Sequence, residues 1–454
     1  MSEPATERDG WTRPATPTRR ERLSLLYDVE TSYLTCHIVK PEHAKRTDRP
    51  PDVAVHNKPC DGVVAYYHAC HATWKDQSPT SKMTKAVVIL TLEKHREGVW
   101  ITRLVEELIR RFENDNSKCS RARSDEGNDE QQGKLQVMVV AVESLDVDQF
   151  PLSSPPAWAG LVNRVSDAAS PNLVKLTLSI VQTAELWGIP IFNGARPYTI
   201  CCNKIMHHQV FGRAGLMTPR SALVNLGSSD LREKLSAAAN SLKNNMGCNW
   251  PMLIKPNSAG FGSGIQFLRD EEDLQKFANG ICLEKDDADT QNYPSEDGIV
   301  LLSEYIRPID ECIYRVWFLD GKVQCAIRRR LLDCDDNPAN DFTAGCAGGG
   351  SCSLQYMKKK RNAGATIMLS WEVPEDVARD MSKILEVLGD QCHAGSVEFL
   401  YNSDLSRVYF DLNLLSTLPL NDGSISNEGN VWEQNFNHWS ELANAVAKKV
   451  LGAY

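Results

Sequence analysis

The apolar positions of the chain change their period along its length, and from about residue 86 this change predicts alternating strands and helices. Short apolar runs typical of strands occur at residues 86–92, 135–142 and 160–164. Apolar positions at helical spacing occur at residues 101–112 and 173–187. Strand, helix and strand in this order predict a small parallel α/β domain.

Beyond residue 201 the pattern favours short strands joined by turns. A helix is expected at residues 204–216, where glycine and proline follow the last apolar positions. Asp320-Gly321 lies between two strand-like runs and is the strongest hairpin signal in the chain. The further strands expected here cover residues 253–256, 299–305, 314–319, 322–327, 396–401 and 407–413.

Three stretches show no sustained period. Residues 1–80 are rich in Pro, Thr, Arg and His, and we expect a partly disordered extension there. The polar residues 114–133 predict a mobile loop, and residues 284–297, with six acids against one lysine, predict a second disordered stretch.

Composition and charge exclude several classes of protein. The 454 residues carry 50 basic and 59 acidic side chains, a net charge of −9, which argues against a nucleic-acid binder with a broad basic face. No apolar run approaches the roughly 20 residues that a membrane span requires. The fourteen cysteines are scattered without a regular framework, and the first 35 residues contain no apolar core of an export signal. We therefore expect reduced thiols and a cytoplasmic protein without a membrane or nucleic-acid partner.

A glycine-rich loop at residues 257–264 is the first candidate for binding chemistry. It follows a strand that ends in Lys255-Pro256, and its glycines allow consecutive N–H groups to point at one anion. Its spacing matches neither the dinucleotide fingerprint nor the phosphate loop that ends in Gly-Lys-Ser/Thr. A plain hairpin turn is the alternative, and Lys255 favours phosphate binding over it, because a cation beside the glycines can neutralise phosphates.

Two acids and an amide near the C-terminus form a candidate metal site. Side chains alternate between the faces of a strand, so Asp411 and Asn413 are expected on one face, with Phe410 and Leu412 on the other. A four-residue turn before Arg407 would place Glu398 directly opposite Asp411. Like charges opposed in this way are unfavourable unless a divalent cation joins them, and these hard oxygen ligands suit Mg²⁺.

Arginines on the Asp320-Gly321 hairpin could reach the same site. Arg315 lies on one arm and the run 328–330 on the other, and a guanidinium fork there would hold phosphate or carboxylate oxygens. A hairpin with solvent-facing arginines is the alternative. Pairing through a two-residue turn places Arg328 on the Arg315 face.

Taken in order, these segments resemble the ATP-grasp superfamily, in the branch of glutathione synthetase and the ligases that add glutamate to a ribosomal protein. The match spans about residues 160–420. The resemblance implies a parallel α/β domain followed by two α+β subdomains that clasp ATP. The parts expected are an extension at 1–80, an α/β domain at 81–200, a subdomain with a glycine-rich lid at 201–300, and a subdomain with the metal site at 301–454.

The resemblance also implies roles for individual residues. The contacts to the nucleotide phosphates and the lid would be Lys204, Lys255, Ser258, Gly260, Gly262 and Gly264. The hinge that receives adenine would be Glu304, Tyr305 and Ile306, with Asp310 or Glu311 at the ribose. Arg315 and Arg329 would be catalytic, and Glu398, Asp411 and Asn413 would bind Mg²⁺, as two ions with Mn²⁺ a possible substitute. The family more often has Glu at the position of Asp411, whose shorter side chain can still bind the ion.

The activity implied is an ATP-dependent carboxylate–amine ligase that acts on small-molecule or peptide substrates through an acyl phosphate. Thr343 and Gly345 stand where the peptide-tailing ligases have arginine and asparagine, so the substrates stay open, as does the oligomeric state. A kinase resembling the inositol polyphosphate kinases is one alternative, with Arg328–Arg330 and Lys358–Arg361 as its basic residues. A nucleotide-binding regulatory protein without catalysis is the other.

Other cysteines and histidines have simpler interpretations. A zinc site at Cys36, His37, Cys60, His68, Cys70 and His71 matches no closed four-ligand spacing, and unliganded residues are the expectation. His207 and His208 are expected on a helix surface, and Cys201 and Cys202 are expected to pack in the interior.

Overall fold

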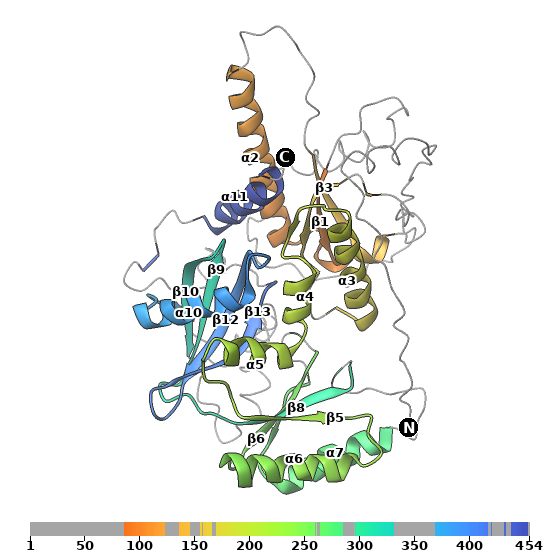
Figure 1. The fold of residues 1–454 in the computed structure, drawn as a ribbon, viewed down its shortest axis with the longest axis vertical. Helices are drawn as coiled ribbons and strands as arrows, with labels where there is room; N and C mark the ends of the chain where they lie inside the picture. The colour runs from red at the N-terminus through yellow and green to blue at the C-terminus, as the bar shows by residue number, and fades with distance from the viewer. Residues whose placement is uncertain are drawn as a thin grey trace, which may run out of the picture. The chain divides into compact units, whose positions relative to one another are not determined.

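Three β-sheets organise the part of the chain that the computed structural model describes (Figure 1). The described residues are 86–122, 136–145, 155–156, 158–165, 169–258, 260, 264–284, 295, 297–330, 368–415, 419, 431–432 and 437–452; at the helix ends 113–122, 282–284 and 451 only the backbone is described. They all belong to one compact unit of the chain. The predicted extension at 1–80 and its Cys/His cluster therefore lie outside the described residues, as does most of the stretch 284–297.

The first sheet is parallel, as predicted, with the strand order β2-β1-β3-β4. Its strands are β1 (Ala86–Thr91), β2 (Gln136–Ala141), β3 (Trp158–Asn163) and β4 (Ile191–Phe192). Every residue of β1 is buried, as expected for a strand with both faces covered. Two short 3₁₀ turns follow β1 and β2, at Glu93–His95 and Val142–Ser144.

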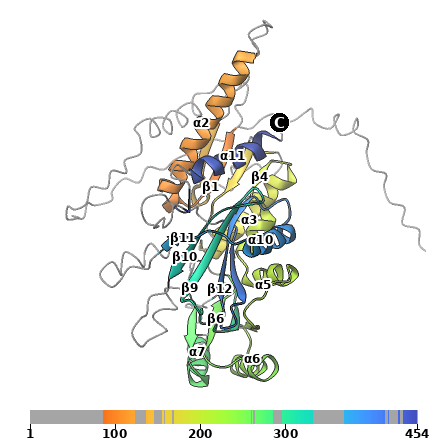
Figure 2. The same ribbon diagram turned by 90° about the vertical axis from the view of Figure 1, so that its left-hand side faces the viewer.

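Helices α2 (Val99–Ala122) and α3 (Pro171–Leu186) belong to this parallel domain. The prediction of a loop from residue 114 is wrong as far as residue 122, because α2 continues there (Figure 2). Phe112 is buried against the core, and the polar residues beyond it extend a helix that is already nucleated, which costs little.

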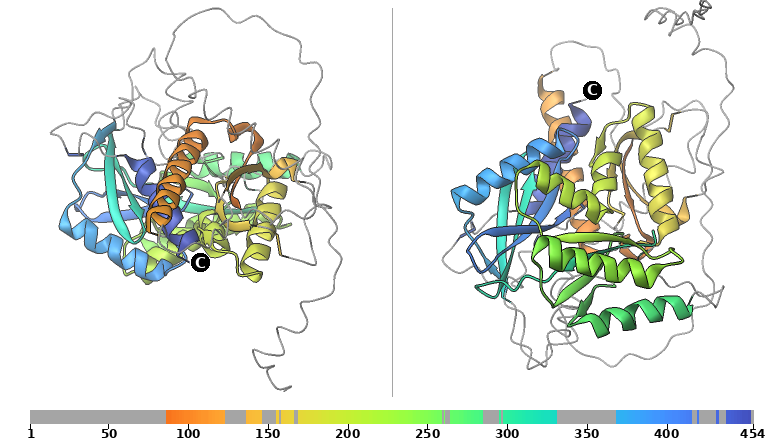
Figure 3. Two further views of the ribbon diagram at one scale, coloured as in Figure 1. Left: turned by 90° about the horizontal axis from the view of Figure 1, so that it is seen from above. Right: turned by 60° about the horizontal axis from the view of Figure 1, so that its bottom comes forward.

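The second sheet has the order β5-β8-β6-β7 and is antiparallel. It contains β5 (Ser221–Asn225), β6 (Met252–Pro256), β7 (Gln266–Leu268) and β8 (Ile299–Glu304), and helices α6 (Leu231–Met246) and α7 (Glu271–Glu284) lie side by side against it (Figure 3). Met252 and Ile254 pack under these helices, whereas Leu253 belongs to a small cluster apart from them. By alternation, Lys255 faces away from α6 and α7.

The third sheet has the order β11-β10-β9-β12-β13. Its strands are β9 (Cys312–Leu319), β10 (Lys322–Arg330), β11 (Met368–Ser370), β12 (Ala394–Tyr401) and β13 (Arg407–Asn413). The predicted hairpin is confirmed: Asp320 and Gly321 have φ values of 47° and 76°, which a tight turn between twisted strands requires. Helix α10 (Glu375–Leu388) packs on one face, together with α4 (Ala195–Cys201) and α5 (Lys204–Arg213).

Two β-bulges set which side chains share the other face of this sheet. The first lies between Val323 and Cys325, and beyond it Ile327 pairs with Arg315. Arg329 therefore shares the face of Arg315, and Arg328 does not. The second bulge skips Phe410, so that Glu398 pairs with Asp411 although Tyr401 pairs with Arg407.

The C-terminal helix α11 (His438–Leu451) returns to the parallel domain. It packs against α2 and contacts β3 and β4, so its apolar side chains belong to the same core as β1 (Figures 1 and 2). The sequence pattern did not predict this return. Among the described helices, none has the length and apolar character to span a bilayer.

Candidate active site

The candidate site is built on adjacent residues of three strands. Arg315 of β9 pairs with Glu398 of β12, which pairs in turn with Asp411 of β13. Residues directly opposite each other in antiparallel strands point to the same face, so the three side chains form one row. The expected opposition of Glu398 and Asp411 is confirmed. The expectation that Phe410 shares the face of Leu412 is wrong, since Leu412 lies in the core while the Phe410 ring faces Lys255, whose Nζ is 5.6 Å from its centroid.

Glu398 is a buried carboxyl group among charged neighbours. Its side chain is 4% exposed, and its Oε1 lies 3.3 Å from Nη1 of Arg315. Burial raises the pKa of Glu398 to about 7, and the neighbouring Asp411 acts in the same direction, against Arg315 and Arg329. Its Oε2 is buried and has no hydrogen-bond partner among the described residues. A buried, unpaired carboxylate oxygen is costly unless a cation or donor reaches it.

Asp411 is held by His207, and the prediction that this histidine lies on a helix surface is wrong. His207 was expected on the surface of α5, but its side chain is 2% exposed and its Nδ1 lies 3.4 Å from Oδ1 of Asp411. Burial would raise the pKa of Asp411, and the hydrogen bond to His207, with the charges of Lys204 and Arg315, lowers it to about 2. The same Nδ1 lies 3.4 Å from the backbone nitrogen of Leu412, so it donates to Asp411 when protonated and accepts from Leu412 when bare.

A signal for the burial of His207 was present in the sequence. Residues three and four apart share a helix face, and Val210 and Phe211 are apolar and buried. Asn203 caps the helix by accepting from the Met206 amide, which fixes where the helix begins. The three positions 207, 210 and 211 together therefore mark the buried face.

The residues present fit a divalent cation with hard ligands. Glu398 and Asp411 offer carboxylate oxygens, of which Oε2 of Glu398 has no partner in the described part of the chain, and Asn413 offers an amide oxygen. Oδ1 of Asn413 accepts from the Leu415 amide at 3.0 Å, and its second contact is the Cys201 thiol at 3.8 Å, a weak donor that a cation could displace. Within the described ranges, no group of three His, Cys, Asp or Glu side chains forms a metal site, so this candidate needs the amide.

Both predicted catalytic arginines are buried, and the charge of each acts on Glu398. Arg315 also donates from Nε to Ser396 Oγ at 2.9 Å, and its guanidinium lies over the Trp317 ring. Arg329 is 9% exposed and its charge acts on Glu398. Arg330 instead pairs with Glu311 at 3.3 Å. Of the three consecutive arginines, Arg329 is therefore buried near the acids, and Arg330 forms an ion pair with Glu311.

The lysines and the glycine loop meet through Asn257, which the sequence analysis did not single out. Asn257 is 1% exposed, its backbone oxygen accepts from the Lys204 amide, and its Oδ1 accepts from the Ile205 amide at 3.0 Å. Its Nδ2 donates to Asp297 at 2.6 Å. This one residue ties the start of α5, with Lys204, to the start of the glycine loop, and the loop joins β6 to β7.

Only part of the loop can be described. Gly260 is buried, Gly264 has a φ of 73°, and the Ser258 amide donates to Ser295. Gly262 lies outside the described residues, and so do residues 341–349 and 358–361. Cys201 is buried in the core and Cys202 packs against it, which confirms their expected packing role.

The predicted adenine hinge has contacts that its sequence did not indicate. The Glu304 carboxylate accepts from the backbone nitrogen and Nε of Arg220 at 2.7 and 2.8 Å. The Tyr305 amide donates to Pro251, and its ring packs edge-on against Phe267. The Glu304 side chain thus stabilises the strand end, and the contacts of Glu304, Tyr305 and Ile306 to a base stay a prediction.

Asp310, the candidate ribose contact, stabilises its own turn. Its Oδ1 accepts from the Cys312 amide at 3.1 Å and its Oδ2 from the Tyr314 hydroxyl at 2.5 Å. Because Asp310 is exposed, further lone pairs remain open to solvent. Its role at a ribose stays a prediction.

Comparison with known proteins returns matches among solved structures. No protein-family model and no curated protein sequence matches the chain. The structure of the ATP-grasp ligase PsnB with its minimal precursor, Mg and ADP is 15% identical, covers 82% of this chain and 100% of its own, and has a TM-score of 0.46. The D-cycloserine synthetase DcsG is 13% identical over 80% of this chain and 99% of its own, with a TM-score of 0.49.

A third match is the D-alanine–D-alanine ligase from Bacillus anthracis complexed with ATP. It is 15% identical over 82% of this chain and 98% of its own, with a TM-score of 0.48. Solved ATP-grasp ligases are thus among the structures that this chain resembles. All three TM-scores lie below 0.5, so the function proposed below rests on the geometry of this chain.

Proposed function

We propose that this protein is an ATP-dependent carboxylate–amine ligase of the ATP-grasp superfamily. The observation that carries the proposal is the meeting of two dissimilar half-sites. Lys255 of the second sheet lies over Phe410, the residue next to Asp411 in the third sheet. Lys204 is tied to the glycine loop through Asn257 and acts on Asp411 by its charge. A triphosphate between the sheets would therefore meet cations from one side and carboxylates that bind Mg²⁺ from the other.

The residues support a reaction in two steps. Transfer of the terminal phosphoryl group of ATP to a substrate carboxylate gives an acyl phosphate and ADP, and an amine then displaces phosphate to form an amide. Mg²⁺ bound at Glu398, Asp411 and Asn413 would neutralise phosphate charge. Lys204 and Lys255 hold phosphate oxygens, and Arg315 and Arg329 stabilise the negative charge on the acyl group. None of these steps needs a covalent nucleophile from the protein.

The arginine run bears on the kinase alternative. A kinase for a polyanionic substrate needs several cations on one wall of its pocket. Arg328 faces away from Arg329, and Arg330 is paired with Glu311. Of the run, only Arg329 shares the face of the acids, which favours the ligase.

The test is a screen for ADP release with ATP, Mg²⁺ and paired libraries of amines and carboxylic acids, followed by mass spectrometry of the product. We expect ADP only when both substrates are present, and an amide as product. Lys255→Ala should lower turnover at least 100-fold, and Lys276→Ala, at an exposed lysine of α7 paired with Glu272, should leave it unchanged. A phosphorylated product would establish the kinase instead, and bound ATP without any turnover would indicate a regulatory protein.

A further inference from the structure

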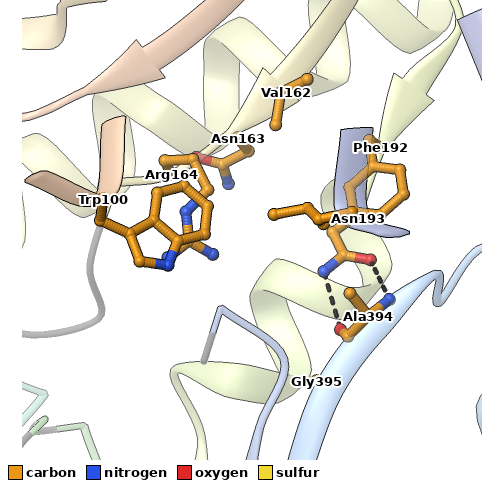
Figure 4. A pocket seen from close by; sticks show the side chains of 9 residues that line it. Trp100, Val162, Asn163, Arg164, Phe192, Asn193, Ala394 and Gly395 are labelled. Carbon is orange, nitrogen blue, oxygen red and sulfur yellow. Dashed lines mark hydrogen bonds between the residues drawn. The ribbon is translucent and has the colours of Figure 1, made fainter. Parts of the chain in front are cut away.

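A small pocket lies at the carboxyl ends of the parallel strands, outside the row of acids and arginines. It is lined by Trp100 of α2, residues 162–164 at the end of β3, Phe192 and Asn193 after β4, Ala394 and Gly395 of β12, and Leu442 of α11. Figure 4 shows Trp100, Asn163 and Arg164 on one side of it, with Phe192, Asn193 and Ala394 on the other. The strand order β2-β1-β3-β4 changes direction between β1 and β3, and open α/β sheets bind ligands at this point.

Three hydrogen-bond donors of this pocket have no acceptor in the part of the chain that the structure describes. Nε1 of Trp100, Nδ2 of Asn163 and Nε of Arg164 are buried and have no partner among the described residues. Asn163 is 1% exposed, and its Oδ1 accepts from the Val165 amide, which directs its Nδ2 away from that contact. The hydroxyl of Thr91, at the end of the neighbouring strand β1, is likewise buried without a partner. Buried donors are rarely left unsatisfied, and several in one place indicate a missing acceptor.

Among the residues that the structure describes, no acid balances the positive charge of this pocket. The Arg164 guanidinium lies 3.6 Å above the Trp100 ring and forms no ion pair with a described acid, and no acid lines the pocket. Burial lowers the pKa of Arg164 to about 9, so the group stays charged at neutral pH at a cost in stability. A buried charge of this kind is stabilised by an anion with complementary hydrogen bonds.

The opposite wall is held rigid by Asn193. Its Nδ2 donates to the backbone oxygens of Ala394 and Leu414 at 2.9 and 2.5 Å, and its Oδ1 accepts from the amides of His393 and Ala394 at 2.8 and 3.1 Å. All of its main contacts are therefore used within the protein. The donors that remain for a ligand are those of Trp100, Asn163 and Arg164, on the other side of the pocket.

We propose that the Arg164 pocket binds an oxyanion headgroup of the ligase's substrate, a carboxylate that is not the one activated by ATP. The pocket reaches β12 at Gly395, three residues before Glu398. At about 3.3 Å per residue, this separation is roughly 10 Å. A carboxylate bound beside Arg164 thus lies too far from Glu398 to receive the phosphoryl group, so the substrate would carry its activated carboxylate at the far end of a chain that spans this separation. The inference rests on the proposed ligase function.

The test measures anion binding directly, by the indole N–H resonances of the full-length protein in NMR titrations. Trp100→Phe identifies the Trp100 resonance among the ten tryptophans, and it removes one donor while an aromatic ring stays at this position. Glutarate is the probe, with inorganic phosphate as a second arm and sodium chloride as the control for ionic strength. We expect a saturable shift of the Trp100 resonance with glutarate, and about 10- to 100-fold weaker binding in Arg164→Gln.

Arg103→Gln is the matched control, because Arg103 is an exposed arginine of the same helix as Trp100 and should leave the affinity unchanged. Glutarate affinity that is unaltered in Arg164→Gln, a shift that sodium chloride reproduces, or a response to phosphate alone would overturn the proposal. If Arg164→Gln does not fold, glutarate affinity that is equal in Trp100→Phe and parent, measured by calorimetry, overturns it as well.

Enzyme kinetics separate this proposal from the proposed function. With substrates found by the ADP-release screen, Arg164→Gln should raise the KM of the carboxylate-bearing substrate about 10- to 100-fold and leave the KM of ATP unchanged. Glutarate binding without any ligase activity would refute the ligase but not the pocket. Ligase activity with an unchanged KM in Arg164→Gln would refute the pocket alone.

Discussion

Exchanging Glu398 for glutamine separates the cost of a buried carboxylate from its use as a metal ligand. Its side chain is 4% exposed, and burial raises its pKa from 4.5 to about 7. At about 1.4 kcal/mol per pKa unit, this rise corresponds to about 3 kcal/mol. The folded protein binds the proton of the Glu398 carboxyl group more tightly than the unfolded chain does. The contribution of Glu398 to the free energy of unfolding is therefore fully present below pH 4.5, and it is lost as the pH rises to about 7.

We expect metal-free Glu398→Gln to be more stable than the parent at pH 8, by up to about 3 kcal/mol, because the amide needs no ionisation. The advantage should shrink toward pH 5, where the parent is protonated. Mg²⁺ with a non-hydrolysable ATP analogue should stabilise the variant far less than the parent, since an anionic ligand is gone. Urea unfolding at pH 5 and pH 8, with and without these ligands, measures all three effects.

Glu386→Gln is the matched control, because Glu386 is exposed on α10 and should change neither stability nor its response to ligands. A Glu398→Gln variant less stable than the parent at pH 8 would mean that the ion pair with Arg315 outweighs the cost of burial. Equal stabilisation of variant and parent by Mg²⁺ and the analogue would refute Glu398 as a metal ligand.

Three further changes test buried residues, two at the site and one at the start of α11. His207→Ala should weaken apparent Mg²⁺ affinity about 10- to 100-fold by calorimetry, with metal-free nucleotide binding unchanged, because Asp411 loses the side chain that orients it; equal Mg²⁺ affinity would refute this role. Asn257→Ala should cost about 2–4 kcal/mol in urea unfolding, because the Ile205 amide and a carboxylate lose a buried partner; a loss below 1 kcal/mol would contradict it. His438→Gln tests pH dependence: burial lowers the pKa of His438 to about 4, so the parent should lose stability as pH falls from about 6.5 to 4, and the variant should lose less over this range in urea unfolding. Equal slopes would contradict that assignment.

The two bulges show how far the sequence could predict the site. Alternation and turn chemistry predicted every strand of the third sheet except β11, because these are local properties of the chain. The hairpin turn alone selected Arg328, and one extra residue between Val323 and Cys325 selects Arg329 instead. Glu398 does oppose Asp411, but through a bulge at Phe410 and not through the four-residue turn expected. A bulge depends on packing between sheets and carries no motif of its own, so its position could not be predicted.

The Arg164 pocket could not be predicted for a different reason. Its donors come from α2 and β3, and its walls from β12 and α11, so the residues that meet there are up to 342 positions apart in sequence. The return of α11 to the first sheet closes it, and neither helical periodicity nor charge marked that return. Sequence patterns predict which face of an element is buried, whereas the partner of that face depends on the topology.

The charges of the candidate site suggest that nucleotide and metal bind as one unit. Three cations act on two carboxylates there, Lys204, Arg315 and Arg329 against Glu398 and Asp411, and Lys255 lies over the neighbouring Phe410 ring. Free Mg²⁺ would enter a region of excess positive charge, and it would also compete with the Arg315 guanidinium for Glu398. A triphosphate reverses the sign of the local charge and offers the ion further oxygen ligands. We therefore expect Mg²⁺ to bind weakly alone and much more tightly with the ATP analogue; similar Mg²⁺ affinities with and without the analogue, measured by calorimetry, would contradict this coupling.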